Sequence, residues 1–155
     1  MNGFVAIGAT PTDQAPITSG AFWPAVDPDD ALKDKRIDGT VTPPRLRAAL
    51  IDAIATVNHD LAGWMAAQIA LGFDTLAEVP APVVDDESIH VHRYRRAVYC
   101  LAAADLTEQY RSFDATDAGH QYADKLETPI GDLRRAAHWA LRDIRGEQRT
   151  TVDLI

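Results

Sequence analysis

The sequence predicts an all-α protein: a small bundle of about four helices, with an extended N-terminal arm and an extended C-terminal tail. Apolar residues recur at spacings of three and four over long stretches, which is typical of helices buried along one face. Alanine-rich runs favour helix over strand. With 155 residues, 46% of them hydrophobic, the chain can form one domain with its own core. We divide it into an arm (1–26), a helical domain (27–146) and a tail (147–155).

The arm combines Gly and Pro with Thr, Ser and Ala, and it shows no helical or alternating apolar period. It has too little apolar surface to offset its ordering entropy, so we expect it to be mobile in isolation. Phe22 and Trp23 are an exception, because adjacent large aromatic side chains are costly to expose. They are expected to anchor the arm in a groove of its own bundle or of a neighbour. The closeness of Trp23 to the first helix favours its own bundle.

Two helices are predicted in the first half of the domain. Asp27 is placed to cap the first, Pro28 suits its first position, and the helix should reach about Arg36. The second begins behind Thr42 as its cap and closes at Gly72. Its apolar stripe is the strongest helical pattern in the chain and contains Leu46, Leu50, Ile54, Val57, Leu61, Trp64, Met65 and Ile69.

A third helix is predicted from Ser88, its cap, to about Ser112, after one turn at 75–79 and a loop at 80–82. Its spacing identifies the face that should be buried. The residues of that face are Val91, Tyr94, Val98, Leu101, Ala102, Leu106 and Tyr110.

The fourth helix should begin between Asp114 and Asp117 and end before Gly146. Pro129 lacks a backbone donor and clashes one turn back, so the helix is either kinked there or split into two. Thr128 suits a fresh cap and slightly favours the split. The apolar face contains Tyr122, Leu126, Ile130, Leu133, Ala137, Ala140, Leu141 and Ile144.

The chain is acidic, with 23 Asp and Glu against 15 Lys and Arg and a net charge of -8. A surface that grips nucleic-acid phosphates is expected to be basic, so this balance argues against ordinary nucleic-acid binding. It is compatible with the bore of a ring, whose acidic walls would repel a passing duplex and keep it mobile. An acidic surface that merely aids solubility is the simpler alternative.

Cys100 is the single cysteine, so the chain has no intrachain disulfide and is compatible with a reducing cytoplasm. The N-terminus lacks the basic region of a signal peptide, and no apolar run is long enough to span a membrane. We therefore expect a soluble protein that no signal peptide exports.

The histidines and carboxylates predict no metal, cofactor or catalytic site. His90 and His92 would lie on different faces of a helix, and the lone cysteine supplies no paired thiolate motif. The carboxylates at 85–87 precede a helix start, where negative charge commonly opposes the helix dipole. Asp105 interrupts an apolar face, and we expect it to face solvent or pair with an arginine rather than act in catalysis.

Arg93, Arg95 and Arg96 form a basic run on the third helix and are candidates for intersubunit or phosphate contacts. Neighbouring Glu and Asp residues make ion pairs, within or between subunits, the more economical interpretation. The acidic character of the whole chain also weighs against phosphate binding.

The tail, 149–155, alternates apolar and polar residues and is predicted to be extended. Thr151, Val152, Leu154 and Ile155 are the candidate residues for binding a partner, because such a segment can add a strand to an open sheet edge. A frayed end without a partner is the alternative.

Many short segments, in their order and spacing, point to one family, although none is a chemical signature alone. They are Phe22-Trp23-Pro24, Val26-Asp27, Thr40-Val41, Pro44-Arg45-Leu46-Arg47, Gly72-Phe73, Leu76, Val79-Pro80-Ala81, Glu87-Ser88-Ile89, Arg96-Ala97-Val98, Tyr110-Arg111, Asp114-Ala115, Ala123-Asp124, Trp139-Ala140, Ile144, Gly146, Arg149, Val152 and Ile155. Together they resemble the head-completion proteins (gpL type) of tailed phages, small helical subunits that join the portal of a DNA-filled capsid to the neck or tail. Pro129 and Gly131 depart from the likeness, because the family continues a helix there.

The resemblance implies a structural virion protein, not an enzyme, that needs no cofactor and acts at the head-to-tail neck. It would bind the portal protein after packaging, help to retain the genome and meet the next neck or tail-completion protein. Its neighbours would be copies of itself in a dodecameric ring, with DNA only as passing cargo and no membrane contact. During assembly it would be in the host cytoplasm.

Two other classes of function stay open. A small acidic helical regulator would bind a protein partner through a groove beside the second helix. A hydrolase would use Asp105 or the carboxylates at 85–87. Size in solution with and without portal separates connector from regulator, and loss of turnover on carboxylate removal would identify a hydrolase.

Overall fold

The computed structural model describes residues 14–35, 37, 41–113 and 117–148. The elements are α1 (Pro28–Lys35), α2 (Pro43–Asp60), α3 (Ala62–Ala70), the short 3-10 helix η1 (Leu76–Glu78), β1 (Val83–Val84), β2 (Glu87–Ser88), α4 (Ile89–Phe113) and α5 (Asp117–Arg145). The predicted all-α class is therefore confirmed. None of the described helices is both long and apolar enough to cross a membrane.

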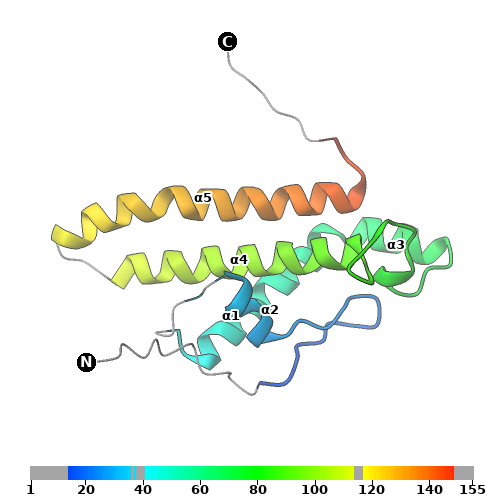
Figure 1. Cartoon of the computed structure of the whole chain (residues 1–155), viewed down its shortest axis with the longest axis horizontal. Helices are drawn as coiled ribbons and strands as arrows, with labels where there is room; N and C mark the ends of the chain where they lie inside the picture. Colours follow the sequence, from blue (N-terminus) through cyan, green and yellow to red (C-terminus); the bar gives the residue numbers. More distant parts are fainter. Residues whose placement is uncertain (1–13, 36, 38–40, 114–116, 149–155) are drawn as a thin grey trace, which may run out of the picture.

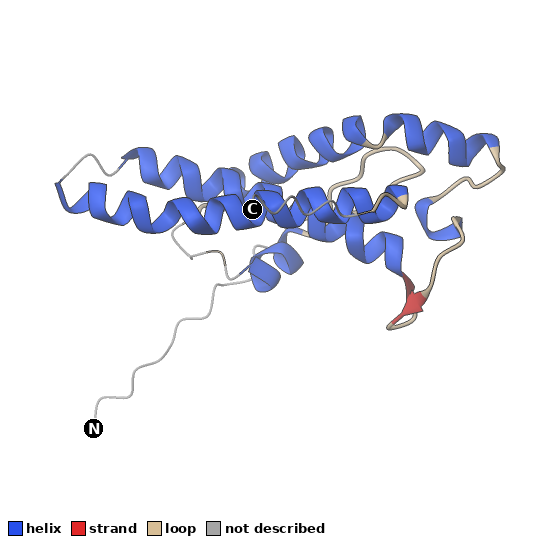
Figure 2. Cartoon of the chain, turned by 90° about the horizontal axis from the view of Figure 1, so that it is seen from above, coloured by secondary structure: helices blue, strands red, loops and turns tan. Residues whose placement is uncertain are grey.

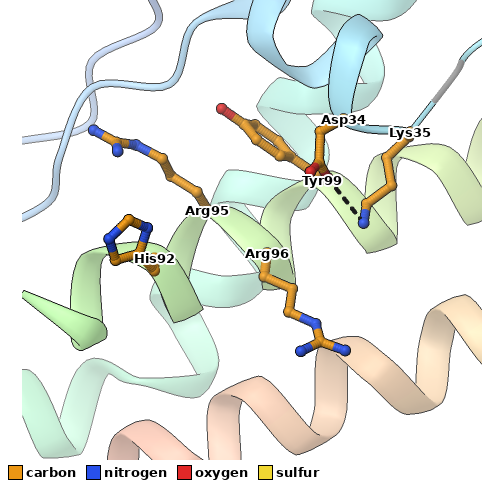
Figure 3. A pocket seen from close by; sticks show the side chains of 6 residues that line it. All are labelled: Asp34, Lys35, His92, Arg95, Arg96 and Tyr99. Atoms are coloured by element: carbon orange, nitrogen blue, oxygen red, sulfur yellow. Dashed lines mark ion pairs between the residues drawn. The ribbon is translucent and has the colours of Figure 1, made fainter. Parts of the chain in front are cut away.

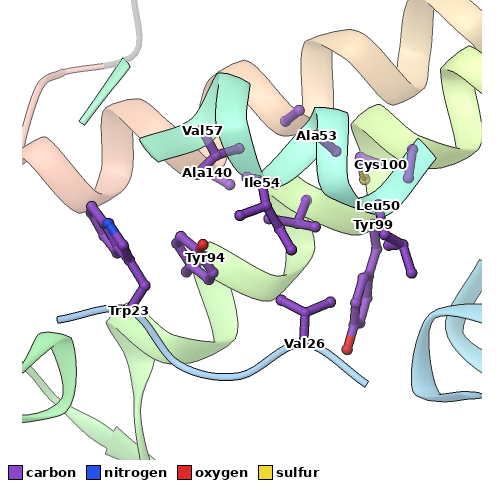
Figure 4. Close-up of a cluster of buried hydrophobic side chains, with 14 of the residues drawn as sticks. Trp23, Val26, Leu50, Ala53, Ile54, Val57, Tyr94, Tyr99, Cys100 and Ala140 are labelled. Atoms are coloured by element: carbon purple, nitrogen blue, oxygen red, sulfur yellow. The ribbon is translucent and has the colours of Figure 1, made fainter. Parts of the chain in front are cut away.

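α4 is the centre of the bundle. α5 lies along one side of it, and α1 and α2 lie on the other (Figure 1). The apolar faces predicted for the second, third and fourth helices meet in one core, part of which is drawn in Figure 4. Among the predicted stripe residues whose side chains are described, only Ile69 is exposed.

Side-chain caps confirm two of the predicted helix starts. The carboxylate of Asp27 accepts a hydrogen bond from the backbone N–H of Asp29 at 2.8 Å, at the start of α1. The hydroxyl of Ser88 accepts one from the N–H of His90 at 3.3 Å, at the start of α4. Each bond satisfies a donor that the first turn of a helix leaves without an intrahelical partner.

Thr42 precedes α2 as predicted, but its side chain makes no capping hydrogen bond. A capping oxygen accepts from the second or third N–H of a helix, and the second residue here is Pro44, which has none. The backbone defines this start instead, because the carbonyl of Thr42 accepts from the N–H of Leu46 at 3.1 Å.

The single helix predicted over 42–72 is wrong, because α2 ends at Asp60 and α3 begins at Ala62. Leu61 between them has φ -95° and ψ 1°, although its N–H still bonds to the carbonyl of Val57 at 3.0 Å. Leu61 is fully buried, whereas no residue of α3 is buried. The apolar pattern misled because α3 has no charged residue and Gln68 is its one polar side chain, so its period does not select one buried face.

α5 continues through Pro129 as one helix, so the predicted split at Thr128 is wrong. A proline inside a helix removes a hydrogen bond and costs on the order of 3 kcal/mol. Packing along α4 offsets this cost, since Ile130, Ala137 and Leu141 on α5 are buried.

The acidic run before α4 is a hairpin turn, which the sequence did not predict. β1 and β2 pair antiparallel, and Asp85 and Asp86 join them with φ of 51° and 59°. Positive φ at both central residues defines a type I′ turn, which Asn-Gly and Asp-Gly favour. A pair of aspartates therefore gave no strong turn signal. Figure 2 shows the hairpin projecting where α4 begins.

The described part of the arm folds onto the bundle and buries Ile17, Phe22, Trp23 and Val26. Ile17 and Val26 exchange two backbone hydrogen bonds of 2.7 and 2.9 Å. Trp23 stacks on Tyr94 with ring centroids 5.0 Å apart, and Phe22 meets Trp23 edge-on at 4.8 Å. These aromatic contacts place the arm anchor in the protein's own core.

A chain of hydrogen bonds joins three segments at Tyr94. Its hydroxyl donates to Oδ1 of Asn58 in α2 at 2.8 Å, and Nδ2 of Asn58 donates to Oγ of Ser19 in the arm at 3.0 Å. Tyr94 is fully buried, so its hydroxyl requires a partner of this kind. The chain fixes the arm, α2 and α4 in one register.

His90 lies next to this cluster, with its ring 5.6 Å from that of Trp64 in an edge-to-face arrangement. Burial, and then the charge of Arg93, lower the pKa of His90 below its ordinary value of 6.5. Its Nδ1 is buried and finds no hydrogen-bond partner among the described residues. The site therefore favours the neutral imidazole.

Replacing Leu61 with alanine should lower the free energy of unfolding by about 2–5 kcal/mol, because it removes a fully buried leucine. Ile51→Ala is the matched control: Ile51 is 47% exposed, and its loss should cost no more than about 0.5 kcal/mol. Denaturant titration measures both. An unchanged unfolding midpoint for Leu61→Ala would show that this face of α2 is not core.

Stability should fall as the pH drops through about 6.5, because the unfolded chain, with the ordinary histidine pKa, then binds a proton that folded His90 resists. His90→Gln should flatten this dependence between about pH 7 and pH 5, and His138→Gln, at an exposed position, is the control variant. Denaturant titrations over a pH series measure the slopes. Equal slopes for the parent and His90→Gln would contradict the interpretation of the site.

Candidate functional site

Basic side chains gather where the end of α1 meets the first half of α4. They line an open pocket of about 410 Å³, drawn in Figure 3. α1 supplies two of the lining residues and α4 the other four. Spacings of three and four place most of the α4 residues on one side of the helix. The lining consists of Asp34, Lys35, His92, Arg95, Arg96 and Tyr99.

Two of these cations already have carboxylate partners. Nζ of Lys35 lies 2.9 Å from the carboxylate of Asp34, and NH1 of Arg95 donates to the carboxylate of Glu87 at 2.6 Å. Nδ1 of His92 lies 3.7 Å from the same Glu87 carboxylate. Burial is the largest single effect and acts to lower the pKa of Lys35, but the hydrogen bond to Asp34 and smaller contributions from the Asp34 charge and from Cys100 together outweigh it, so the net change is upward. The pocket is therefore largely neutralised from within.

Arg96 differs from its neighbours, because it is exposed and forms no ion pair within the described part of the chain. Figure 3 shows its side chain pointing toward α5, away from that of Arg95. Tight binding of a phosphate or carboxylate requires several donors aimed at one point. This arrangement instead suits a single exposed contact with an anionic group.

Arg93 lies outside the pocket. Its Nε is 3.9 Å from the carboxylate of Asp143 in α5, and its NH1 donates to the carbonyl oxygen of the same residue at 3.3 Å. The three arginines predicted as one basic run thus have three different surroundings. Their role in intersubunit or phosphate contacts stays a prediction.

Sequence reasoning missed four residues that line this surface or pair with it: Asp34, Lys35, Glu87 and Tyr99. Burial, and then the charge of Asp30, raise the pKa of Tyr99 to about 12, so its phenol stays neutral at physiological pH. The packing of α1 on α4 brings Lys35 and Tyr99 together, and that contact leaves no local signal in the sequence. Glu87 was missed because the hairpin that positions it was not predicted.

The carboxylates considered for catalysis do not come together. Asp85 and Asp86 are exposed in the hairpin turn, before α4 begins. Asp105 is partly exposed and accepts a hydrogen bond from Nε2 of Gln109 at 2.8 Å. At about 1.5 Å per residue, Asp105 lies roughly 24 Å along α4 from its start. Among the described residues, no group of three or more His, Cys, Asp or Glu side chains is arranged to hold a metal ion.

The candidate partner-binding residues of the tail, Thr151, Val152, Leu154 and Ile155, lie outside the described residues. Their role stays a prediction. Phe22 and Trp23, the predicted arm anchor, lie in the core described above.

Comparison with known proteins identifies the family. The family model "Phage head completion protein (GPL)" matches residues 17–155. The head completion/stabilization protein of Escherichia phage P2 is 39% identical over 153 residues, covering 99% of this chain and 90% of that protein. The probable head completion/stabilization protein of Haemophilus phage HP1 (strain HP1c1) is 27% identical over 143 residues, covering 92% and 94%. No solved structure matches the chain. The chain therefore belongs to the phage head completion protein (GPL) family.

Proposed function

We propose that the protein is a connector of the phage particle, which binds the portal after DNA packaging, helps to retain the genome and joins the head to the tail. The family match carries this proposal, because it covers residues 17–155 and thus nearly the whole chain. The relatives, similar over almost their full length, are named for head completion and stabilisation. Such a role requires binding surfaces and no catalytic centre. The site of action is the neck of the virion, after assembly in the host cytoplasm.

Copies of the protein would stand side by side in a dodecameric ring around the DNA channel. A contact between unlike faces of neighbouring copies closes into a ring when the rotation per copy completes the circle. The long sides of α4 and α5 offer rigid helical faces for this contact (Figure 1). A ring also multiplies the weak contacts of each copy with the portal and with the next neck or tail-completion protein.

DNA would be cargo rather than a ligand. The net charge of -8 opposes phosphate binding, and Arg93 and Arg95 already contact carboxylates of the same chain. Retention of the genome would then come from plugging the channel or recruiting the next protein. The duplex would stay free to leave at infection.

No observation favours the alternative of a regulator with a groove beside α2. The chain's own arm covers α2 there: Nδ2 of Asn58 bonds to Ser19, and NH1 of Arg47 donates to the carbonyl of Ala15 at 2.8 Å. A partner would have to displace the arm to bind.

Deleting residues 150–155 should abolish binding to filled heads while leaving the helical content unchanged, because the tail holds the predicted partner-binding residues and α5 ends before it, at Arg145. Co-sedimentation with heads and circular dichroism measure the two effects. Replacing Val152, Leu154 and Ile155 with serine keeps the length and should also weaken binding. Normal co-sedimentation of the shortened protein would rule out the tail as the portal contact.

The isolated protein should not retain duplex DNA at physiological salt, where a non-specific binder shows dissociation constants of roughly 10⁻⁴ to 10⁻⁶ M. Fluorescence anisotropy over a salt series measures this, with Arg96→Ala as the variant that lacks the exposed cation. A micromolar complex that weakens steeply with salt and is lost in Arg96→Ala would mean a phosphate patch on α4. The proposal that DNA passes through the channel without being bound would then have to be abandoned.

A further inference from the structure

α3 is an apolar helix that buries none of its residues. Its sequence, AGWMAAQIA, contains no charged side chain, and Trp64 and Met65 are only partly buried. Ile69 is 45% exposed, and Leu71 just after the helix is 70% exposed. A helix that is apolar on all sides is normally enclosed by other protein. Trp64 and Met65 pack against the core of this chain, but the described residues leave Ile69 and Leu71 uncovered.

The β1–β2 hairpin projects from the same end of the bundle as α3, and Figure 2 shows the two elements separated across that end (Figures 1 and 2). Val83 is 69% exposed and Val84 51% exposed. Four of the six large exposed hydrophobic residues in the described part of the chain thus belong to α3 and the hairpin or to the residue just after α3. We call Ile69, Leu71, Val83 and Val84 the apolar end. Single exposed apolar residues are ordinary, whereas a concentration at one end marks a protein-binding surface.

The segment that contains the apolar end carries charge of one sign. Residues 48–92 contain seven Asp and Glu and no Lys or Arg, so they hold -7 of the net charge of -8. Asp60, Asp74, Glu78, Asp85 and Asp86 within this segment are all exposed. Arg145 reaches the region, with NH1 3.4 Å from the carbonyl of Asp60, but its Nε pairs with Glu147 at 2.7 Å.

A second copy of the chain does not complement this surface. Outside 48–92 the chain is almost neutral: -7 of the net charge of -8 lies within the segment, which leaves -1 for the rest. Its arginines on α4 and α5 are largely used internally: Arg93 contacts Asp143, Arg135 pairs with Asp132 at 2.7 Å, and Arg134 pairs with Glu108. Two apolar ends would bring carboxylates together, and like charges across an interface are costly.

We propose that the apolar end docks onto a different virion protein, whose surface has an apolar centre rimmed with Lys and Arg. The inference rests on the proposed function for the location of that partner in the particle, and it adds a binding surface separate from the tail. The apolar side chains would supply most of the affinity, and the carboxylates would direct and speed the encounter.

The first test uses filled heads assembled without the protein. The double variant Ile69→Ser, Leu71→Ser should bind the heads about tenfold or more weakly, because it removes the exposed anchors without touching the core. Ile51→Ser is the matched control, with similar exposure of 47% on α2, and should bind within about twofold of the parent. Binding of the double variant equal to the parent, or an equal loss in the control, would overturn the proposal.

The second test concerns charge. Asp85→Asn with Asp86→Asn removes two carboxylates and keeps a residue type that accepts positive φ, so the hairpin should survive. The variant should associate more slowly at low salt and show a flatter salt dependence than the parent. An unchanged salt dependence would exclude a basic rim on the partner.

A photo-cross-linking amino acid at Leu71 in intact particles identifies the occupant without relying on the binding assay. The expected result is a cross-link to a different protein, at a segment rich in Lys and Arg. A cross-link to another copy of this chain, or none, would overturn the proposal. Failure of the unmodified protein to bind heads would contradict the proposed function instead, and loss of binding only on tail deletion would leave the tail as the sole contact.

Discussion

The packing of Tyr94 against Trp23 and Asn58 is the contact on which the rest of the fold depends. The ring stacks on the arm, the hydroxyl donates to α2, and the backbone belongs to the central helix α4. Neither the arm nor α2 could shift along α4 without exposing an aromatic ring or leaving a buried hydroxyl without a partner. With α4 fixed in this way, one side of the helix carries α5, and the hairpin lies where α4 begins (Figures 1 and 2).

The helical spacing of apolar residues predicted the helices that bury one face. The stripes of α2, α4 and α5 are confirmed for the side chains that the structure describes, because their polar faces leave only one way to pack. α3 was misread because it has no polar face, and the hairpin was missed because two aspartates occupy positions of positive φ. The alternatives of a kink or a split at Pro129 considered only the hydrogen bond and the clash that a proline introduces. Packing along α4 keeps α5 a single helix through this residue.

The candidate site was predictable in part. The basic run at 93–96 was visible in the sequence, but its ion pairs depend on a hairpin and on the docking of α1, both of which are tertiary features. The net charge of -8 was also visible, yet it was treated as a property of the whole surface. Its concentration in residues 48–92 becomes meaningful only when the same segment is found to contain an apolar helix with exposed residues. Charge gathered in one segment with exposed apolar residues indicates a binding surface, whereas charge spread evenly over the protein indicates only solubility.

The central claim is that this chain forms the connector between the portal and the next neck or tail protein. Electron cryomicroscopy of the neck, in particles made with and without the protein, tests it most directly. The account predicts a ring of helical subunits beneath the portal, with the volume of this chain repeated around the channel, that is missing when the protein is absent. Identical density at the portal vertex in both kinds of particle would contradict it.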